Sequence, residues 1–384
     1  KYILCLGSDV SKALFGSKAG VTDMEGKVLD FEYSAGLAPG QTGEAYARTA
    51  QAMVAVHPKQ VLRDRPSQHQ LSRSLFRFGR LTSGYEIGKD EEVDHRHIYS
   101  EGELSDLLIE VEGCKDKKDN VIAVDAEWHG DHPINAGSYI RTIQFAWLPK
   151  HAAGVCLFKP GGGVVSGFMA ADNPTRLSER TIHLLRTFFL GGSYETEDGE
   201  VVKFRRKRVV GHFFNADLEW FVDYLGLDIR EAYHCKTSDL QIKSRKNRVC
   251  RKYLDEGFQV GDTVPAWYRT RHEGGGDTGF MAHAIEETAS FRLETLAMRY
   301  TTAPSYDGDL QDWKTAYCKE KGISAKNMGG YGDCPDSVLL PYGIYDADVT
   351  LRLFYALDVL LEEDYEQNNC REAYWETHIT SPAI

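Results

Sequence analysis

The chain has 384 residues, of which 42% are hydrophobic and 27% are charged, and its mean hydropathy is -0.41. This length excludes a small disulfide-stapled fold and predicts two or three domains, since a domain usually holds roughly 100 to 200 residues. No apolar run reaches the roughly 18 residues of a transmembrane helix, so we expect no membrane span. The 57 acidic and 45 basic residues give a net charge of -12. That charge alone argues against a nucleic-acid binder, although an average over the surface does not describe a site.

The eight cysteines are scattered without a CxxC pair or zinc-ligand spacing, which favours reduced thiols in a cytoplasmic protein. The chain opens on KYILCLG without a basic-then-apolar leader, so we expect no signal peptide. Both this opening and the final THITSPAI have the character of cuts in a longer polypeptide. We therefore expect the chain to be part of a larger protein.

The first 85 residues have the pattern of a small α/β unit, with short apolar runs for strands and amphipathic spacing for helices. The expected elements are strands over 2–6 and 53–56, a helix over 10–15 that ends at Gly16, and a helix over 64–80. Residues 86–97 are polar and charged without periodicity, which predicts a linker.

The remaining residues, 98–384, predict a second and larger domain. Ser100 and Glu103 are expected to form a capping box ahead of a helix. In this motif the Ser100 side chain accepts from the Glu103 backbone N–H, and the Glu103 side chain accepts from the Ser100 backbone N–H. The expected elements after it are strands over 121–128, 139–148, 154–158 and 208–212, helices over 181–190 and 216–226, and a largely helical remainder beyond 235 with a loop at 274–276. Strands followed by helices predict an α/β (α+β) fold, with a mixed sheet flanked by helices.

Two carboxylates end the apolar strand VIAVDAE. Asp125 and Glu127 stand two residues apart, and strand alternation sends both side chains to one face. Carboxylates so placed repel each other unless a cation lies between them, and a hard divalent metal prefers such oxygen ligands. The alternative is a solvated acid at a strand end, and this short motif alone does not decide between the two.

Two further segments add acids to the same expected site. Asp217 stands at the start of a helix that follows a short strand. Tyr342 and Asp346 are four residues apart on a helix that Pro341 is expected to begin, so they share one helix face. Tyr342 alternatively packs as an ordinary buried aromatic, and Asp346 alternatively lies in solvent.

Three segments in order, DAE at 125–127, GHFFNAD at 211–217 and YGIYDADVTLRLF at 342–354, resemble the motifs of the DEDDy 3′→5′ exonucleases. The resemblance is closest to the proofreading domain of family A DNA polymerases, and it extends to Asp277-Thr278 at a helix start and to the helical run ETASFRLETLAMRYT. It covers roughly residues 94–384 and implies a ribonuclease H-like fold. It also implies a role for each matching residue: Asp125, Glu127, Asp217 and Asp346 as metal ligands, and Tyr342 as the residue that orients the attacking water.

The resemblance further implies a phage-like polymerase fragment that removes nucleotides from a DNA 3′ end with two Mg²⁺ or Mn²⁺ ions. Its substrate would be a single-stranded or frayed end, its polymerase module would follow Ile384, and its location would be a bacterial host's cytoplasm. The alternatives are a catalytically degenerate domain that holds DNA for the attached polymerase, and an RNA-trimming enzyme of the same fold.

The second motif departs from the family, which often has Asn two residues after the Gly and an aromatic directly before the Asp. Here these places hold Phe213 and Ala216, so the support around Asp217 must differ. Aromatic and imidazole side chains beside the acids are candidates for stacking on the terminal nucleotide, with packing as the alternative: Trp128, His129 and His212. A run of cations predicts a DNA-binding arm, with a solvated loop as the alternative: Lys243, Arg245, Lys246, Arg248, Arg251 and Lys252.

The first unit resembles the C-terminal half of a bacterial-type uracil-DNA glycosylase. The resemblance covers residues 1–85, with His57-Pro58 in the place of the motif that contacts uracil, while the half with the water-activating acid is absent. It implies an inactive glycosylase-like scaffold that binds single-stranded or template DNA through Arg63, Arg65, Arg73, Arg77 and Arg80. Alternatively, His57 simply ends a strand beside a proline turn.

Overall fold

The computed structural model describes residues 1–16, 28–35, 46–63, 66–84, 92–115, 120–233, 240–243, 253–255, 257–266, 268–269, 274–285, 291–304, 306–368 and 374–375. The chain divides into two compact units, one of Lys1–Glu91 with Glu294–Ser305 and one of Glu92–Leu293 with Tyr306–Ile384. Within the described residues, no helix combines the length and the apolar character needed to cross a bilayer.

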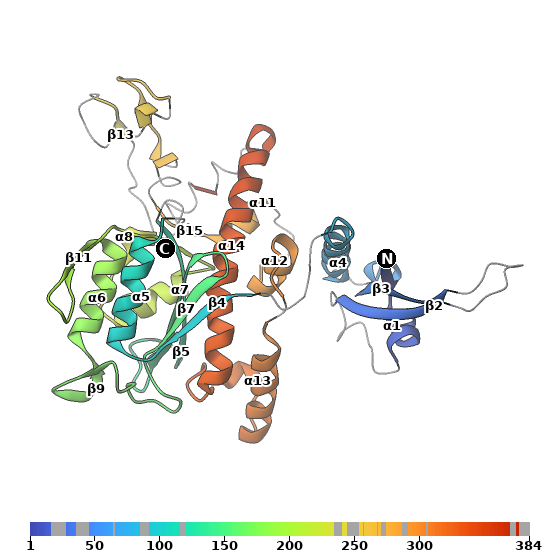
Figure 1. Cartoon of the computed structure of the whole chain (residues 1–384), viewed down its shortest axis with the longest axis horizontal. Helices are drawn as coiled ribbons and strands as arrows, with labels where there is room; N and C mark the ends of the chain where they lie inside the picture. The colour runs from blue at the N-terminus through green and yellow to red at the C-terminus, as the bar shows by residue number, and fades with distance from the viewer. Residues whose placement is uncertain are drawn as a thin grey trace, which may run out of the picture. The chain divides into compact units, whose positions relative to one another are not determined.

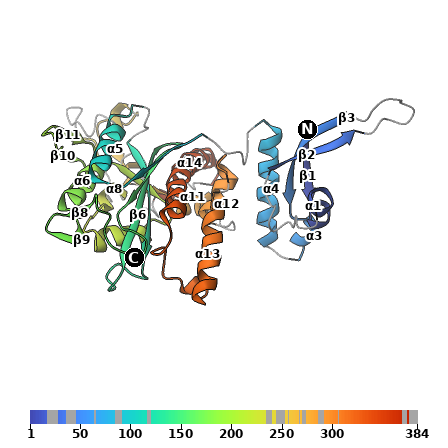
Figure 2. The same ribbon diagram turned by 60° about the horizontal axis from the view of Figure 1, so that its bottom comes forward.

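The first unit is built on a three-stranded sheet in the order β1-β3-β2, with β1 parallel and β2 antiparallel to β3. Its elements are β1 (Tyr2–Leu6), α1 (Ser8–Phe15), β2 (Val28–Ala35), β3 (Tyr46–Ala55), α3 (Pro58–Val61) and α4 (Pro66–Thr82), together with most of α12 (Leu293–Tyr300). Figure 2 shows α4 alongside this sheet, where it contacts β1 and β3. Cys5, Ala52 and Val54 on the two parallel strands are fully buried and form the core.

The second unit contains a six-stranded mixed sheet in the order β15-β12-β5-β6-β7-β4. Its strands are β4 (Asp94–Ile98), β5 (Val121–His129), β6 (Tyr139–Leu148), β7 (His151–Cys156), β12 (Arg208–Gly211) and β15 (Gly276–Asp277). The strand β6 is antiparallel to both β5 and β7, whereas β12 is parallel to β5 and to β15. The expected ribonuclease H-like mixed sheet is therefore confirmed, with β4 added in parallel beside β7.

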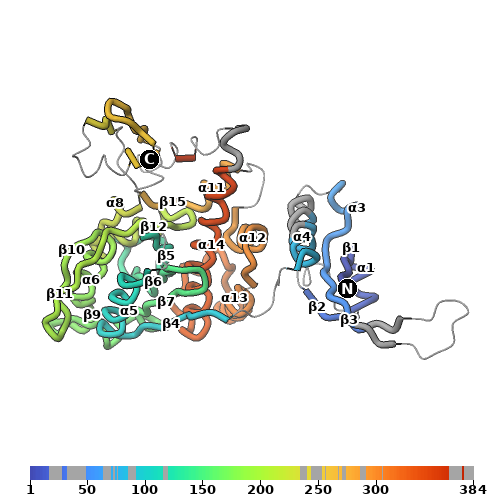
Figure 3. The backbone as a smooth tube through the Cα atoms, turned by 45° about the horizontal axis from the view of Figure 1, so that its top comes forward, coloured from blue at the N-terminus to red at the C-terminus, as the bar shows by residue number. Residues whose placement is uncertain are grey.

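Helices cover both faces of this sheet. Figure 1 and Figure 3 show α14 against one face and α5 and α6 on the opposite side. The helices of the unit are α5 (Glu101–Gly113), α6 (Glu179–Leu190), α7 (Asn215–Glu219), the π-helix η1 (Trp220–Tyr224), α8 (Arg230–Tyr233), α11 (Thr278–Ile285), α13 (Gly308–Lys321), the 3-10 helix η2 (Ala325–Asn327) and α14 (Asp336–Asn368). Short two-stranded pairs are β8 (Met169–Ala170) with β9 (Asn173–Leu177), β10 (Gly192–Glu195) with β11 (Val201–Phe204), and β13 (Leu240–Gln241) with β14 (Thr263–Val264).

The α14 helix packs across β5, β6 and β7 because two glycines let the backbones approach. A Cβ atom on Gly154 of β7 would lie 2.8 Å from Ile344 Cγ1, and one on Gly343 would lie 2.5 Å from Gln144 Nε2. Real Cβ atoms do not approach other atoms so closely, because repulsion rises steeply at this separation. This close packing fixes the height of the helix over the sheet, and with it the place of every functional side chain on α14.

The start of α14 corrects the sequence prediction. The helix begins at Asp336, so Pro341 lies inside it rather than at its first turn. An internal proline removes one backbone hydrogen bond and costs about 3 kcal/mol. The preceding residues Leu339 and Leu340 are fully buried, and their burial offsets that cost, since each such side chain contributes roughly 1.5 to 3 kcal/mol.

Three other expectations need correction. Residues 94–97 of the expected linker belong to β4, which pairs with β7, while 86–91 lie outside the described residues. Gly276 is not in a loop but in β15, at the edge of the sheet. The Ser100 side chain accepts from Glu103 N–H as expected, but the Glu103 carboxylate accepts from Tyr99 N–H.

Candidate active site

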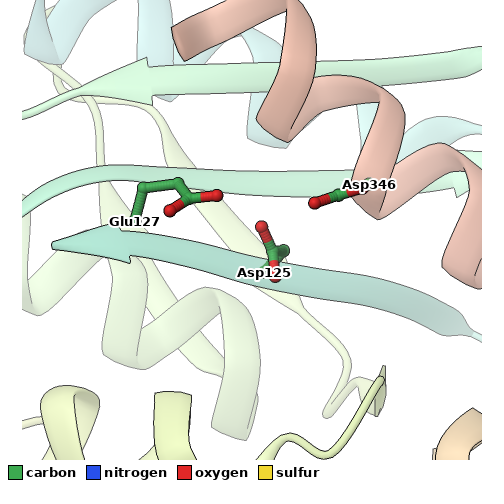
Figure 4. A group of neighbouring side chains, drawn as sticks. All are labelled: Asp125, Glu127 and Asp346. Carbon is green, nitrogen blue, oxygen red and sulfur yellow. The ribbon is translucent and has the colours of Figure 1, made fainter. Parts of the chain in front are cut away.

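Three acids converge above the central strand of the larger sheet. Asp125 and Glu127 lie on β5 and Asp346 lies on α14, and Figure 4 shows their carboxylates pointing toward one another. Each offers one oxygen to a group in which all the atoms lie within 4.8 Å of one another. Strand alternation explains the shared face of the first two acids, and the packing of α14 across β5 brings the third.

Asp217 lies beside these three acids and comes from the segment that follows β12, the neighbour of β5 in the sheet. It lies in α7, which follows β12, and its Oδ1 accepts a hydrogen bond from Ala126 N–H at 3.0 Å. Ala126 stands between the two acids of β5, so this bond ties α7 to the strand at the level of the site. The side chain is only 6% exposed. All four acids expected from the sequence are thus neighbours.

The electrostatics of the site are those of crowded, buried acids. Burial raises the pKa of Asp125 well above its ordinary value, and the charges of Asp217 and Glu127 raise it further. Burial likewise raises the pKa of Glu127, followed by the charges of Asp346 and Asp217. For Asp217, burial raises the pKa to about 8, against the opposing bond from Ala126 N–H. Without a counter-charge, burial and mutual repulsion thus favour the protonated forms of these carboxyl groups.

A divalent cation fits this donor set. The buried Oδ2 of Asp125 has no hydrogen-bond partner among the described residues, so this acceptor oxygen lacks a donor. Carboxylate oxygens are the ligands that Mg²⁺ and Mn²⁺ prefer. A cation there would offset both the burial of these charges and their mutual repulsion, which raise the pKa values in that order. The candidate ligands are Asp125, Glu127 and Asp346, with Asp217 beside them.

Tyr342 lies one helical turn before Asp346 on α14, as expected, and is half-buried. It packs against the cluster of Leu310, Cys334 and Leu339, so the alternative of a packed aromatic describes part of its surroundings. A second tyrosine, which the sequence did not indicate, reaches the acids directly: the Tyr306 hydroxyl donates to Asp346 Oδ1 at 2.5 Å.

The altered surroundings of Asp217 are supported by Asp277 at the end of β15. Its fully buried carboxylate accepts hydrogen bonds from the backbone N–H groups of Phe213 and Phe214 and from the Tyr233 hydroxyl. The same carboxylate accepts from Gly279 N–H and so also caps α11. Phe213 adopts a left-handed backbone with φ of 51°, which costs energy for a bulky residue. These bonds hold the turn that leads into α7.

The residues expected to contact a nucleotide differ in their surroundings. Trp128 stacks on Trp220 of η1, with ring centroids 5.2 Å apart. The buried Nδ1 of His129 has no hydrogen-bond partner among the described residues. Both ring nitrogens of His212 have protein partners at 2.8 Å, Thr278 Oγ1 and Phe291 O. Their contacts with DNA stay predictions, and the bonds of His212 suit the packing alternative better.

The expected basic contacts are described only in part. Lys243 and Arg63 are exposed. Arg77 is 3% exposed, and this burial disfavours the direct DNA contact predicted for it. Outside the described residues or side chains lie Arg65, Arg73, Arg245, Lys246, Arg248, Arg251 and Lys252. His57 Nδ1 accepts from Lys59 N–H at 3.0 Å and caps α3, which favours the strand-end alternative for this residue.

Two side chains beside Glu127 had no signal in the sequence. The Lys314 ammonium of α13 lies 4.8 Å from the ring centroid of Tyr331, and its charge lowers the pKa of Glu127 against the larger effect of burial. Burial and then the charge of Glu127 raise the pKa of Tyr331. Lys314 lies in α13 and Tyr331 lies between η2 and α14, so their proximity to the acids depends on tertiary structure alone.

Comparison with known proteins gives limited similarity. No protein-family model matches the chain. A segment of 78 residues is 33% identical to a DNA polymerase of Escherichia phage T5, and it spans 20% of this chain and 9% of that polymerase. Among solved structures, Escherichia coli RNase D, an exoribonuclease involved in structured RNA processing, has a TM-score of 0.37 at 11% identity and covers 75% of this chain and 51% of its own. Brucella melitensis NrnC with bound Mg²⁺ has a TM-score of 0.35 at 11% identity, over 76% of this chain and 94% of its own.

Proposed function

We propose that residues 98–384 form a 3′→5′ exonuclease domain that hydrolyses the terminal phosphodiester of a DNA 3′ end, as the proofreading region of a family A, phage-like DNA polymerase. The observation that carries this proposal is the convergence of Asp125, Glu127 and Asp346 within 4.8 Å beside Asp217. The partial identity to a phage DNA polymerase supports the link to DNA synthesis. The polymerase module would lie beyond Ile384, and the expected location is the cytoplasm of the bacterial host.

The four acids would hold two Mg²⁺ or Mn²⁺ ions. When bound, such ions would lower the pKa of a water and stabilise the charge that develops on the leaving 3′ oxygen. The chain's own residues would hold the carboxylate oxygens in place for these ions. Asp217 accepts from Ala126 N–H through Oδ1, which holds its carboxylate beside the three other acids. Asp125 presents an oxygen that no described residue engages.

Other side chains would orient the substrate. The Tyr342 hydroxyl would position the attacking water, since Tyr342 stands one turn from Asp346 on the same helix face. The Trp128 ring, supported by Trp220, would stack on the terminal base. A single-stranded end suits these roles, because a base must leave the duplex before an aromatic side chain can stack on it.

The degenerate DNA-holding alternative is less favoured by the geometry. A domain that only held DNA would gain nothing from burying four mutually repelling acids, because the charge opposes phosphate binding and burial of a charge is costly. A polymerase-linked DNA enzyme and an RNA-trimming enzyme remain distinct outcomes of one experiment.

We expect the purified chain with Mg²⁺ or Mn²⁺ to shorten a 5′-labelled DNA single strand into a ladder of products. An exonuclease of this kind removes nucleotides only from a free 3′ end, so a circular single strand of the same composition should stay intact. The measurement is gel separation of products over time, with EDTA as the metal-free control. Digestion of the circle would contradict the exonuclease assignment.

The same assay decides the substrate. A DNA strand and an RNA strand of matched sequence, carrying different fluorophores, compete in one tube. The proposal expects DNA to be shortened first, because the polymerase link implies a DNA 3′ end. Preferential loss of the RNA strand would replace the proofreading role with RNA trimming and leave the acid site unchanged.

For the first unit we propose a glycosylase-like scaffold, expected over residues 1–85, that lacks base-removal activity. The His57 ring nitrogen that caps α3 supports a structural role for the motif. Exposed Arg63 supports a contact with nucleic acid next to it.

We expect this chain to release no uracil from a uracil-containing oligonucleotide, because the half that would carry the water-activating acid is absent from its sequence. Abasic sites are scored by alkaline cleavage and gel separation, with a uracil-DNA glycosylase as the positive control. Cleavage above the level of the untreated strand would show that the unit is an active enzyme.

A further inference from the structure

Tyr306 makes a direct contact with the acid site that no sequence motif accounts for. It lies just before α13, forty residues from Asp346, and its hydroxyl donates to Asp346 Oδ1 at 2.5 Å. A hydrogen bond from a neutral hydroxyl to a carboxylate is short and roughly twice as strong as one between neutral groups. The bond therefore holds one oxygen of a candidate metal ligand in a fixed direction.

The Tyr306 ring is fixed independently of this bond. It stacks on Tyr345, with centroids 5.2 Å apart and planes 16° from parallel, and it lies 6.0 Å from the Tyr342 ring. The Tyr345 and His95 rings are T-shaped with centroids 4.6 Å apart, and His95 Nε2 is 3.4 Å from Asp348 Oδ2. These aromatic contacts anchor the ring against α14, whose Tyr345 in turn contacts His95 of β4. The hydroxyl therefore stands in place before any cation binds.

The hydrogen bond from Tyr306 to Asp346 should increase the affinity of the site for a metal ion. A carboxylate side chain that rotates freely must lose rotamer freedom when it binds an ion, whereas a carboxylate held by an outer hydrogen bond has already lost it. Removal of such an outer partner typically weakens metal binding about 10- to 100-fold. Asp346 is the candidate ligand contributed by α14.

We propose that Tyr306 is a positioning residue for metal binding: it holds the Asp346 carboxylate in the orientation that completes the cation site on β5. This inference rests on the proposed function, since it assumes that the acids bind a divalent cation. It assigns Tyr306 no contact with substrate or with the reacting atoms. The expected defect of its loss is therefore in metal affinity, with the rate at saturating metal preserved.

The test uses Tyr306→Phe in the full chain, which keeps the stacked ring and removes only the hydroxyl. The matched control is Tyr317→Phe, because the Tyr317 hydroxyl also donates to a carboxylate, Asp333 Oδ2 at 2.6 Å, at an exposed place. Mn²⁺ binding is measured by titration calorimetry without nucleic acid. We expect the Kd of Tyr306→Phe to rise about 10- to 100-fold and that of Tyr317→Phe to stay at the wild-type value.

A second readout separates positioning from a general structural defect. The rate of single-strand shortening is measured against Mn²⁺ concentration, and Tyr306→Phe should shift the half-saturation point while reaching the wild-type plateau. A Kd within about twofold of wild type would overturn the role of Tyr306 and leave the proposed function intact. Absence of Mn²⁺ binding by the wild-type chain itself would overturn both.

Discussion

Asp125→Ala combined with Glu127→Ala should abolish the shortening of a labelled DNA single strand by this protein, with a loss of at least about 10³-fold in rate. Two-metal sites contribute several kcal/mol to the stabilisation of the transition state, and each 1.36 kcal/mol is a factor of ten. The double variant removes both ligands that β5 contributes, including the Asp125 oxygen that no described residue engages. The measurement is the initial rate of product formation at saturating Mg²⁺.

A matched control removes two acids elsewhere. Asp172 and Glu179 flank Arg176 on the surface, with side chains 74% and 82% exposed, and Asp172→Ala with Glu179→Ala changes the net charge equally. This control should keep the wild-type rate, because exposed ion pairs contribute little to stability. Strand binding, measured by fluorescence anisotropy, should persist in both variants, since removing negative charge does not weaken attraction for phosphate. Retained digestion in the double variant would rule out the acids as the catalytic site.

The acids on β5 and α14 were predictable because regular elements carry their own geometry. A period of two fixed the shared face of Asp125 and Glu127, and a period of 3.6 placed Tyr342 one turn from Asp346. Short apolar runs predicted most strands of the larger sheet. The order of those strands was not predicted, since spacing along the chain does not determine which strands pair.

The start of α14 was mispredicted because tertiary packing outweighs the local preference of proline for the first helical turn. Proline at the first helical turn is a reliable signal in isolation. Here Leu339 and Leu340, before Pro341, are buried, and their burial extends the helix through the proline back to Asp336. An internal proline therefore destabilises a helix, but the helix still forms where the burial of neighbouring side chains offsets that free energy.

The residues that support the site could not be read from the sequence. Asp277 was recognisable only as the start of a helix, yet its carboxylate also holds the turn before Asp217 through Phe213 and Phe214 N–H. Tyr306 lies in an aperiodic segment and reaches Asp346 only through the fold. Such residues act across long sequence separations, where neither periodicity nor spacing carries information.

The second large effect concerns the stability of the metal-free protein. Between the ordinary pKa of 3.8 and the folded pKa of about 8, Asp217 carries a proton in the folded chain and none in the unfolded chain. Raising the pH through this window therefore favours unfolding. The raised pKa values of Asp125 and Glu127 act in the same direction. In EDTA, we expect the melting temperature to fall by on the order of 10 °C between pH 5 and pH 8.

Mg²⁺ should reverse this fall, because metal ions compete with protons for the same oxygens and bind the folded chain more tightly as the pH rises. At a concentration of 100 times the Kd, binding adds about 2.7 kcal/mol to the free energy of unfolding. Asp217→Asn should make the metal-free pH profile less steep and reduce the gain from Mg²⁺, whereas Asp172→Asn, at an exposed position, should change neither. The profiles are measured by thermal melts at matched ionic strength with EDTA or Mg²⁺. A metal-free melting temperature that stays constant or rises between pH 5 and about 8 would show that the acids are solvated, and it would remove the electrostatic basis for a cation site among them.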